Sequence, residues 1–227
     1  MILPLVKFVI EQTLWRSKVY FRNKPKIFVV GANKTGTSSL DAYFKAAGYI
    51  TSPQRQFELL RDDYLQGNRQ EIFRLIKRYE TFQDIPFSIA DETFLHDLTA
   101  TYPSAKFILS KRSSDEEWYQ SLCRFHSKGS HDGKWPLTWD DVKKVDYLGK
   151  GRRYDFFIHV VGSEAKEPYD KHTWCAFYNN HNRLVRSFFK GRPNFLEINL
   201  ADPNAESILR NFLGTTADVT VPHRNKS

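Results

Sequence analysis

A turn rich in glycine and hydroxyl residues is the first segment whose residue types could do chemistry. It runs from Gly31 to Ser39 (Gly-Ala-Asn-Lys-Thr-Gly-Thr-Ser-Ser) and contains one lysine, Lys34. Backbone N–H groups in such a turn form a concave nest for anions, and a helix that begins there adds the positive end of its dipole. Lys34 and the hydroxyl groups of Thr37 and Ser38 would supply further donors. The segment therefore predicts a phosphate-binding loop, the alternative being a glycine-rich turn without a ligand.

The segments on either side of this turn are those that a phosphate-binding loop requires. Residues 26–31 (Lys-Ile-Phe-Val-Val-Gly) are a short apolar run rich in β-branched side chains, which predicts a buried parallel strand. Residues 37–47 carry apolar side chains at helical spacing and are followed by Gly48, which predicts a helix. A strand, a tight turn and a helix in this order open a nucleotide-binding α/β fold.

The position of the lysine distinguishes two classes of phosphate loop. In nucleoside triphosphatases the lysine directly follows the second glycine, whereas here Thr37 follows Gly36 and the lysine lies earlier. A second buried strand is predicted over residues 105–110, and it does not end in an acidic residue that could hold Mg²⁺. Both observations disfavour a nucleotide kinase or triphosphatase, which stays the main alternative.

A second group of candidate anion ligands follows the strand over residues 105–110. Arg112 lies just beyond its carboxyl end, the edge at which α/β proteins bind ligands, and a guanidinium can bind phosphate through two parallel hydrogen bonds. Ser121 lies about two turns into a helix that a capping pattern predicts to open at Ser114. The spacing along this helix turns Trp118, Leu122 and Phe125 toward the core. The alternative for Arg112 is a surface ion pair with Asp115.

Three segments together resemble the sulfotransferase family. They are residues 33–39 (Asn-Lys-Thr-Gly-Thr-Ser-Ser), 102–112 (Tyr-Pro-Ser-Ala-Lys-Phe-Ile-Leu-Ser-Lys-Arg) and 118–121 (Trp-Tyr-Gln-Ser). In that family a lysine before a Gly-Thr pair marks the 5′-phosphosulfate loop. An arginine past a strand and a serine on the next helix grip the 3′-phosphate. The similarity, to bacterial-type and related members, spans residues 26–214, although Ser121 follows Arg112 by nine residues where many members have eight.

The resemblance implies that the donor is 3′-phosphoadenosine 5′-phosphosulfate and that the two motifs bind it. The implied binding residues are Asn33, Lys34, Thr35, Gly36, Thr37, Ser38, Ser39, Arg112 and Ser121. The implied reaction is an in-line displacement by an acceptor hydroxyl, with Lys34 stabilising charge on the leaving oxygen. We expect no metal, because the transferred group carries one negative charge and the seven histidines show no ligand spacing.

The residue that removes the acceptor proton is predicted from a further correspondence. In the small-molecule branch of the family this base is a histidine two residues before a proline at a strand end, and the matching stretch here is Asp84-Ile-Pro86. Asp84 is therefore the predicted base, with Asp91, Glu92 and His96 as alternatives. Capping of a turn or helix is the structural alternative for Asp84.

Charge and composition indicate what the protein binds. The net charge is +8, and residues 1–26 contain six basic side chains and one acidic side chain. This excess of positive charge predicts an anionic partner, but the sequence contains no nucleic-acid-binding motif. Residues 5–21 have the spacing of an amphipathic helix, which either docks on the domain or lies on a membrane surface, as in a non-enzymatic membrane-associated protein. The basic cluster over residues 150–153 is expected to be a solvated surface loop, the alternative being a ligand for the 3′-phosphate or for an anionic acceptor.

We therefore predict an α/β protein with a three-layer, P-loop-like fold in which helices flank a central, mainly parallel sheet. A basic helix would occupy residues 1–25, a sulfotransferase domain residues 26–214 and an irregular tail residues 215–227. Further strands are expected over residues 81–84 and 194–199. Further helices are expected over residues 56–79, 93–102, 139–147, 169–190 and 202–214.

The cysteine content indicates the cellular compartment, and the aromatic content indicates which acceptors the protein could bind. Two cysteines, Cys123 and Cys175, offer no framework of disulfides and no metal spacing, which favours a cytoplasmic protein. Aromatic residues make up 15% of the chain, and ring faces suit phenols and sugars as well as a core. The expected acceptor is a small molecule, a carbohydrate or a glycolipid.

Overall fold

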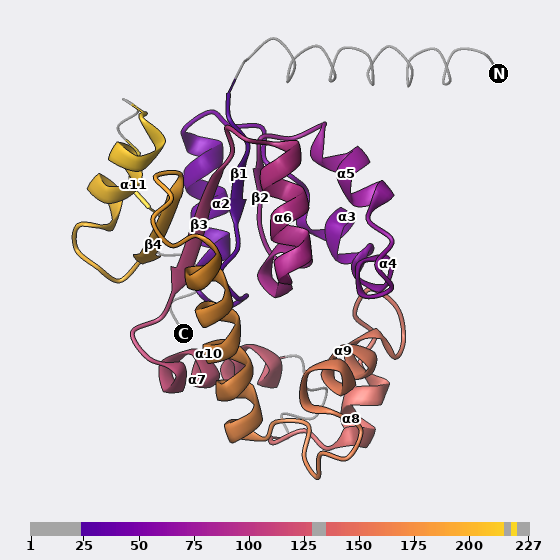
Figure 1. Ribbon diagram of the computed structural model, residues 1–227. Helices are drawn as coiled ribbons and strands as arrows, with labels where there is room; N and C mark the ends of the chain where they lie inside the picture. The colour runs from indigo at the N-terminus through magenta and orange to yellow at the C-terminus, as the bar shows by residue number, and fades with distance from the viewer. Residues whose placement is uncertain (1–23, 129–134, 216–218, 222–227) are drawn as a thin grey trace, which may run out of the picture.

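A parallel sheet lies at the centre of the computed structural model, which describes residues 24–128, 135–215 and 219–221. Within these residues the sheet has four strands in the order β2-β1-β3-β4, and every neighbouring pair is parallel. The strands are β1 (Ile27–Val29), β2 (Thr81–Phe82), β3 (Lys106–Lys111) and β4 (Phe195–Asn199). Helices cover both faces (Figure 1), which confirms the predicted α/β fold class.

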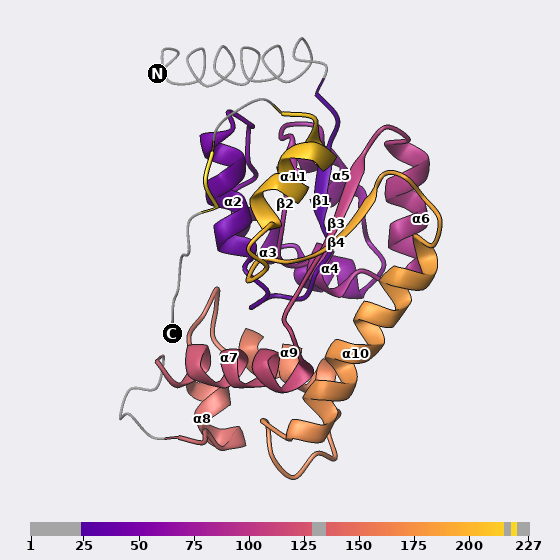
Figure 2. The ribbon, with the colours of Figure 1, turned by 90° about the vertical axis from the view of Figure 1, so that its left-hand side faces the viewer.

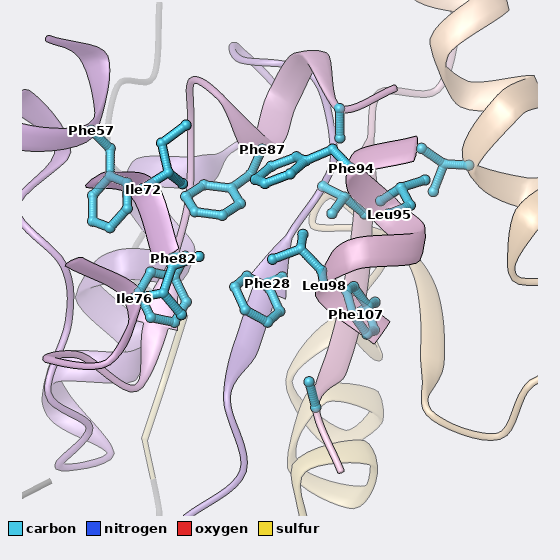
Figure 3. Packing of buried hydrophobic residues seen from close by; sticks show 14 of the residues in the cluster. Phe28, Phe57, Ile72, Ile76, Phe82, Phe87, Phe94, Leu95, Leu98 and Phe107 are labelled. Atoms are coloured by element: carbon cyan, nitrogen blue, oxygen red, sulfur yellow. The ribbon is translucent and has the colours of Figure 1, made fainter. Parts of the chain in front are cut away.

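Side chains that alternate along β1 and β3 give the sheet two apolar faces. On one face the rings of Phe28 and Phe107 stack with their centroids 5.3 Å apart, beneath the apolar sides of four helices (Figure 3). These helices are α3 (Gln54–Glu58), α4 (Arg61–Leu65), α5 (Gln70–Ile76) and α6 (Glu92–Thr101). On the other face Ile27, Val29 and Ile108 pack against α2 (Thr37–Ala46) and α11 (Ala205–Leu213).

A third group of helices lies beyond the carboxyl ends of the strands (Figures 1 and 2). It consists of α7 (Asp115–Ser127), α8 (Trp139–Lys144), α9 (Arg152–Val161) and the first half of α10 (Lys171–Phe188). These helices share an apolar core of their own, in which Trp118, Phe157 and Trp174 are fully buried. They therefore cover the edge of the sheet at which ligands bind in α/β proteins.

Most of the predicted elements are confirmed within one to three residues at their ends. The exceptions have local causes. Residues 56–79 form three short helices rather than one, and Gly67, in the left-handed conformation at φ 79°, follows the end of α4. The last helix begins at Ala205 rather than at the predicted cap, because the Asp202 carboxylate accepts the N–H of Asn204 in a local turn. The predicted helix over residues 5–21 and most of the predicted tail lie outside the described residues.

Gly31 shows how tightly the first strand and its turn pack on β3. A Cβ atom at this position would lie 2.2 Å from the backbone oxygen of Ser110. A backbone oxygen cannot rotate away, so the clash would have to be relieved by moving the strands. We expect Gly31→Ala to lower the free energy of unfolding by about 3 kcal/mol, measured by urea denaturation. Gly48→Ala is the control, because nothing lies within 4 Å of a Cβ there and only the positive φ costs about 1 kcal/mol. Equal losses at the two positions would contradict the steric argument.

Candidate active site

The turn between β1 and α2 contains two residues in the left-handed conformation. Lys34 has φ 69°, and Gly36, which precedes α2, has φ 94°. Left-handed residues in a turn are typical of backbone nests that bind anions. No acidic residue occupies the first turn of α2, and no side chain of a described residue caps it. The positive end of the helix dipole is therefore not neutralised by these residues.

Four backbone carbonyl groups at the turn accept hydrogen bonds from side chains. They belong to Val30 (from His181 Nε2, 2.7 Å), Ala32 (from Thr35 Oγ1, 2.6 Å), Asn33 (from Trp118 Nε1, 2.8 Å) and Lys34 (from Arg112 Nε, 2.9 Å). Because a carbonyl can only accept, His181 carries its proton on Nε2. These bonds fix the peptide planes with their oxygens toward the donors, which favours a hollow formed by N–H groups.

A cavity of about 360 Å³ opens beside the turn, at the carboxyl edge of the sheet. Its walls come from five parts of the chain: the turn, the segment after β2, α3 with α4, α7, and residues 147–157 with α10. The polar side chains that line it include Asn33, Lys34, Thr37, Ser38, Gln54, Glu58, Asp84, His126, Tyr147 and Arg153. The turn thus shares one enclosed space with the predicted base.

Lys34 and Asp84 interact electrostatically in this cavity. The Lys34 ammonium lies 3.3 Å from the centroid of the Phe125 ring. Burial lowers the pKa of Lys34 to about 8, and the negative charge of Asp84 opposes that shift. Burial raises the pKa of Asp84 to about 7, with the charge of Glu58 adding to the shift and Lys34 opposing it. Both groups therefore titrate near neutral pH, the range in which proton transfer is efficient.

Two buried carboxylates, those of Asp84 and Glu58, share one hydrogen-bond donor. Gln54 Nε2 donates to Asp84 Oδ2 at 3.0 Å and to Glu58 Oε1 at 2.8 Å. The Tyr147 hydroxyl donates to Glu58 Oε2 at 2.9 Å, so Glu58 is held from both sides. Asp84 Oδ1 also accepts the N–H of Ile85 at 2.9 Å, which is the local turn contact expected as the alternative. The sequence did not indicate Gln54, Glu58 or Tyr147.

The alternatives to Asp84 as base lie elsewhere. Asp91 caps α6 by accepting the N–H of Phe94 at 2.7 Å, and it also pairs with Arg69. The His96 ring packs edge-on against Phe188, and Glu92 is exposed in the first turn of α6. None of the three lines the cavity, whereas Asp84 does.

Arg112 lies against the turn but outside the cavity lining. Its Nε binds the carbonyl of Lys34, and its Nη1 pairs with Glu117 at 3.2 Å rather than with Asp115, the expected alternative. Ser121 is buried on α7, three residues after Trp118, which binds the carbonyl of Asn33. The structure therefore brings the second motif to the back of the first.

The predicted loop residues divide into two sets. Asn33, Lys34, Thr37 and Ser38 line the cavity. The Thr35 hydroxyl instead binds Ser110 Oγ at 2.7 Å, and Ser39 is buried and does not line the cavity. In a phosphate site Thr35 and Gly36 would therefore act only through their backbone.

Two expectations for the cavity walls are wrong. The basic cluster at residues 150–153 is not a solvated loop, because Gly151 precedes α9 and both Arg152 and Arg153 line the cavity. Phe125, whose helical spacing predicts a core position, is 49% exposed and lies over Lys34. Periodicity alone does not distinguish a side chain that faces a cavity from one that faces a core.

The cavity contains the non-glycine residues with unfavourable backbone conformations. Within the described ranges, Lys34, Asp84 and Leu148 have positive φ values, of 69°, 64° and 61°, and all three line the cavity. Such conformations cost of the order of 1–3 kcal/mol each and cluster at functional sites. This clustering is independent of the charges and lies at the same place as the candidate active site.

Two absences hold for residues 24–128, 135–215 and 219–221. These residues contain no group of three or more His, Cys, Asp and Glu side chains that could hold a metal ion. They also contain no helix with the length and apolar composition that crossing a membrane requires.

Comparison with known families agrees with the geometry. No curated protein matches the chain. A family model described as a sulfotransferase domain matches residues 26–227. The matched range contains the sheet, the turn around Lys34, Asp84 and Arg112. The chain therefore belongs to the sulfotransferase domain family.

Proposed function

We propose that this protein transfers a sulfuryl group from 3′-phosphoadenosine 5′-phosphosulfate to an acceptor hydroxyl and releases adenosine 3′,5′-bisphosphate. Family membership supports sulfuryl transfer in general. The proposed donor and mechanism rest on one observation: Lys34 and Asp84 line the same cavity, beside the turn around Lys34.

The groups around the turn suit a doubly anionic nucleotide. The N–H groups of the turn, the start of α2 and the hydroxyls of Thr37 and Ser38 would hold the 5′-phosphosulfate. Arg112 would hold the 3′-phosphate, with Ser121 as a second donor. Arg112 already touches the turn through the Lys34 carbonyl, so one nucleotide can reach both places. Its Nη2 makes no hydrogen bond to a described residue and remains available.

Lys34 and Asp84 divide the chemistry between them. Asp84 would accept the proton of the acceptor hydroxyl as the bond between that oxygen and sulfur forms. Lys34 would stabilise the negative charge on the bridging oxygen as the bond between sulfur and that oxygen breaks. The cavity keeps both groups partly out of water, which strengthens these interactions. Glu58 contributes by helping to raise the pKa of Asp84 to about 7.

Removing Arg112 tests the donor site. We expect Arg112→Met to weaken binding of adenosine 3′,5′-bisphosphate about a hundredfold, because a charge-assisted pair of hydrogen bonds is worth about 3 kcal/mol. Isothermal titration calorimetry without added metal measures the dissociation constant. Arg74→Met is the matched control, since Arg74 is exposed on α5 and pairs with Glu71. Unchanged affinity in Arg112→Met would remove this residue from the site.

The same titration separates the proposal from its main alternative. A nucleotide kinase or triphosphatase would bind ATP with Mg²⁺ in preference to adenosine 3′,5′-bisphosphate, and Arg112→Met would affect ATP binding less. Tight metal-independent binding of the bisphosphate, followed by transfer of label from a labelled donor to an acceptor, supports sulfuryl transfer. Preference for Mg²⁺-ATP would contradict it.

A further inference from the structure

Arg153 is a partly buried cation that lines the cavity and that the proposed transfer does not use. It is the second residue of α9 and lines the cavity. Its Nη1 atom is buried and has no hydrogen-bond partner among the described residues. Taking a cation out of water without a partner costs several kcal/mol, so such groups are normally paired. A ligand in the cavity is one way to supply the missing partner.

The two neighbouring arginines in the cavity wall differ from Arg153. Arg61 Nη2 lies 2.6 Å from Asp62 Oδ1, and Arg152 Nη1 lies 3.1 Å from Asp62 Oδ2. Arg61 also donates to the carbonyl of Arg152, and Arg152 donates to the carbonyl of Leu59. Both arginines are therefore held by protein groups. Within the described residues Arg153 forms no such ion pair, so it is the better candidate to bind an anion.

The groups that face Arg153 do not supply a counter-charge. Its guanidinium carbon lies 5.7 Å from the centroid of the Tyr147 ring, and it also interacts with Tyr169. The Tyr169 hydroxyl lies 3.1 Å from His126 Nδ1. Burial, with the charges of Arg153 and Lys34, lowers the pKa of His126 to about 3, so its ring is neutral at physiological pH. The wall around Arg153 is thus aromatic and neutral.

Arg153 is linked to Glu58 and Asp84 through the side chains of Tyr147 and Gln54. The Tyr147 ring next to Arg153 carries the hydroxyl that binds Glu58, and Gln54 joins Glu58 to Asp84. The donor phosphates are assigned to the turn and to Arg112, which lies outside the cavity lining. An anion at Arg153 would therefore belong to the acceptor rather than to the donor.

The remaining wall is suited to an apolar body between the anion and the reacting hydroxyl. It includes the side chains of Ile85, Leu148, Phe156, Trp174 and Phe177. A cavity of about 360 Å³ with such a lining and a few convergent polar groups is typical of a small-molecule site. The lining therefore fits an acceptor that is largely apolar with two polar ends.

We propose that the acceptor is a small hydroxylated molecule that carries an anionic group on an apolar body, with the anion bound by Arg153 and the hydroxyl presented to Asp84. This inference rests on the proposed function and names the substrate class of the same site. Guanidinium geometry suits a carboxylate, sulfate or phosphate bound through two parallel hydrogen bonds.

Paired probes test the inference in the presence of saturating adenosine 3′,5′-bisphosphate. The pairs are para-hydroxyphenylpropionate with its primary amide, and ω-hydroxyoctanoate with its primary amide. We expect calorimetry to show that the carboxylate of at least one pair binds at least about tenfold more tightly than the amide, a difference of about 1.4 kcal/mol. In Arg153→Met that ratio falls to near one, while affinity for the amide changes little. Arg183→Met, at an exposed position on α10, leaves the ratio unchanged.

The melting temperature and the affinity for adenosine 3′,5′-bisphosphate are measured on the same variants. Arg153→Met is expected to keep or raise the melting temperature, because an apolar side chain replaces a partly buried charge that has no ion pair among the described residues. A clear fall would show that Arg153 has a structural role and would overturn the inference, as would carboxylates that bind no more tightly than their amides in the unchanged protein. Failure of adenosine 3′,5′-bisphosphate to bind would instead contradict the proposed function. We expect Arg153→Met to bind the bisphosphate as tightly as the unchanged protein, which would show that Arg153 and Arg112 bind different groups.

Discussion

Lys34→Met is expected to lower kcat for sulfuryl transfer about a thousandfold, equivalent to roughly 4 kcal/mol of transition-state stabilisation. The ammonium stands in the cavity beside the turn and lies against Phe125. It would act chiefly on charge that develops on the leaving oxygen, so the loss appears in kcat more than in binding. Transfer from labelled donor, followed over single turnovers, measures the chemical step.

The matched control for Lys34→Met is Lys144→Met, at an exposed position on α8. Lys144→Met should retain full activity. We expect the Lys34 variant to bind adenosine 3′,5′-bisphosphate within about tenfold of the unchanged protein, since the backbone of the turn and Arg112 remain. A Lys34 variant that keeps full kcat would exclude this lysine from catalysis.

Asp84→Asn is expected to lower kcat/KM about a thousandfold, within the range measured for loss of a general base. Asparagine accepts the left-handed conformation that Asp84 adopts at φ 64°, and it retains an oxygen that can accept from Gln54. The substitution therefore removes the basic group without a large change in the backbone. A full denaturation curve that matches the unchanged protein would show that the loss is chemical.

The pH dependence gives an independent reading of the same pair. Asp84 must be deprotonated to act as a base, so kcat/KM of the unchanged protein should rise as pH increases through about 7. Lys34 must be protonated, so kcat/KM should fall as pH increases through about 8. The profile is thus a narrow bell, and Asp84→Asn should abolish its acid limb. The Asn variant should also move the alkaline limb to lower pH, because the Asp84 charge opposes the fall in the Lys34 pKa.

Glu58 provides the matched comparison for the acid limb. Its charge helps to raise the pKa of Asp84, so Glu58→Gln should move the acid limb to lower pH without abolishing it. Asp91→Asn, in the cap of α6, should leave both limbs in place because Asp91 does not line the cavity. A profile that keeps its acid limb in Asp84→Asn would assign the base to another residue.

The elements and the turn around Lys34 could be predicted because their signals are local. The apolar run of β1, the glycine-bounded turn and the periodicity of α2 all lie within residues 26–48. Arg112 could be placed because parallel strands end at a common edge, which fixes where residues just after them lie. Asp84 is predicted from the family correspondence at Asp84-Ile-Pro86, and it lies at the second position after β2.

The opposite wall of the cavity could not be predicted, because it forms only when separate elements pack. Gln54 and Glu58 lie four residues apart, yet no local pattern indicates that they face Asp84. Phe125 has the spacing of a core residue and lies over Lys34 instead. The start of α9 reads as a charged loop because glycines flank its basic residues, and only its packing brings Arg153 into the cavity.

The hydrogen bonds to the carbonyl groups behind the turn bear on whether the turn could work in another protein. Three of their donors, Arg112, Trp118 and His181, lie far along the chain, the last of them 151 residues from its acceptor Val30. Residues 31–39 grafted onto another strand and helix would carry the motif without the groups that orient its peptides. We therefore expect substitution of Trp118 or His181 to weaken binding at the turn, although neither residue lines the cavity.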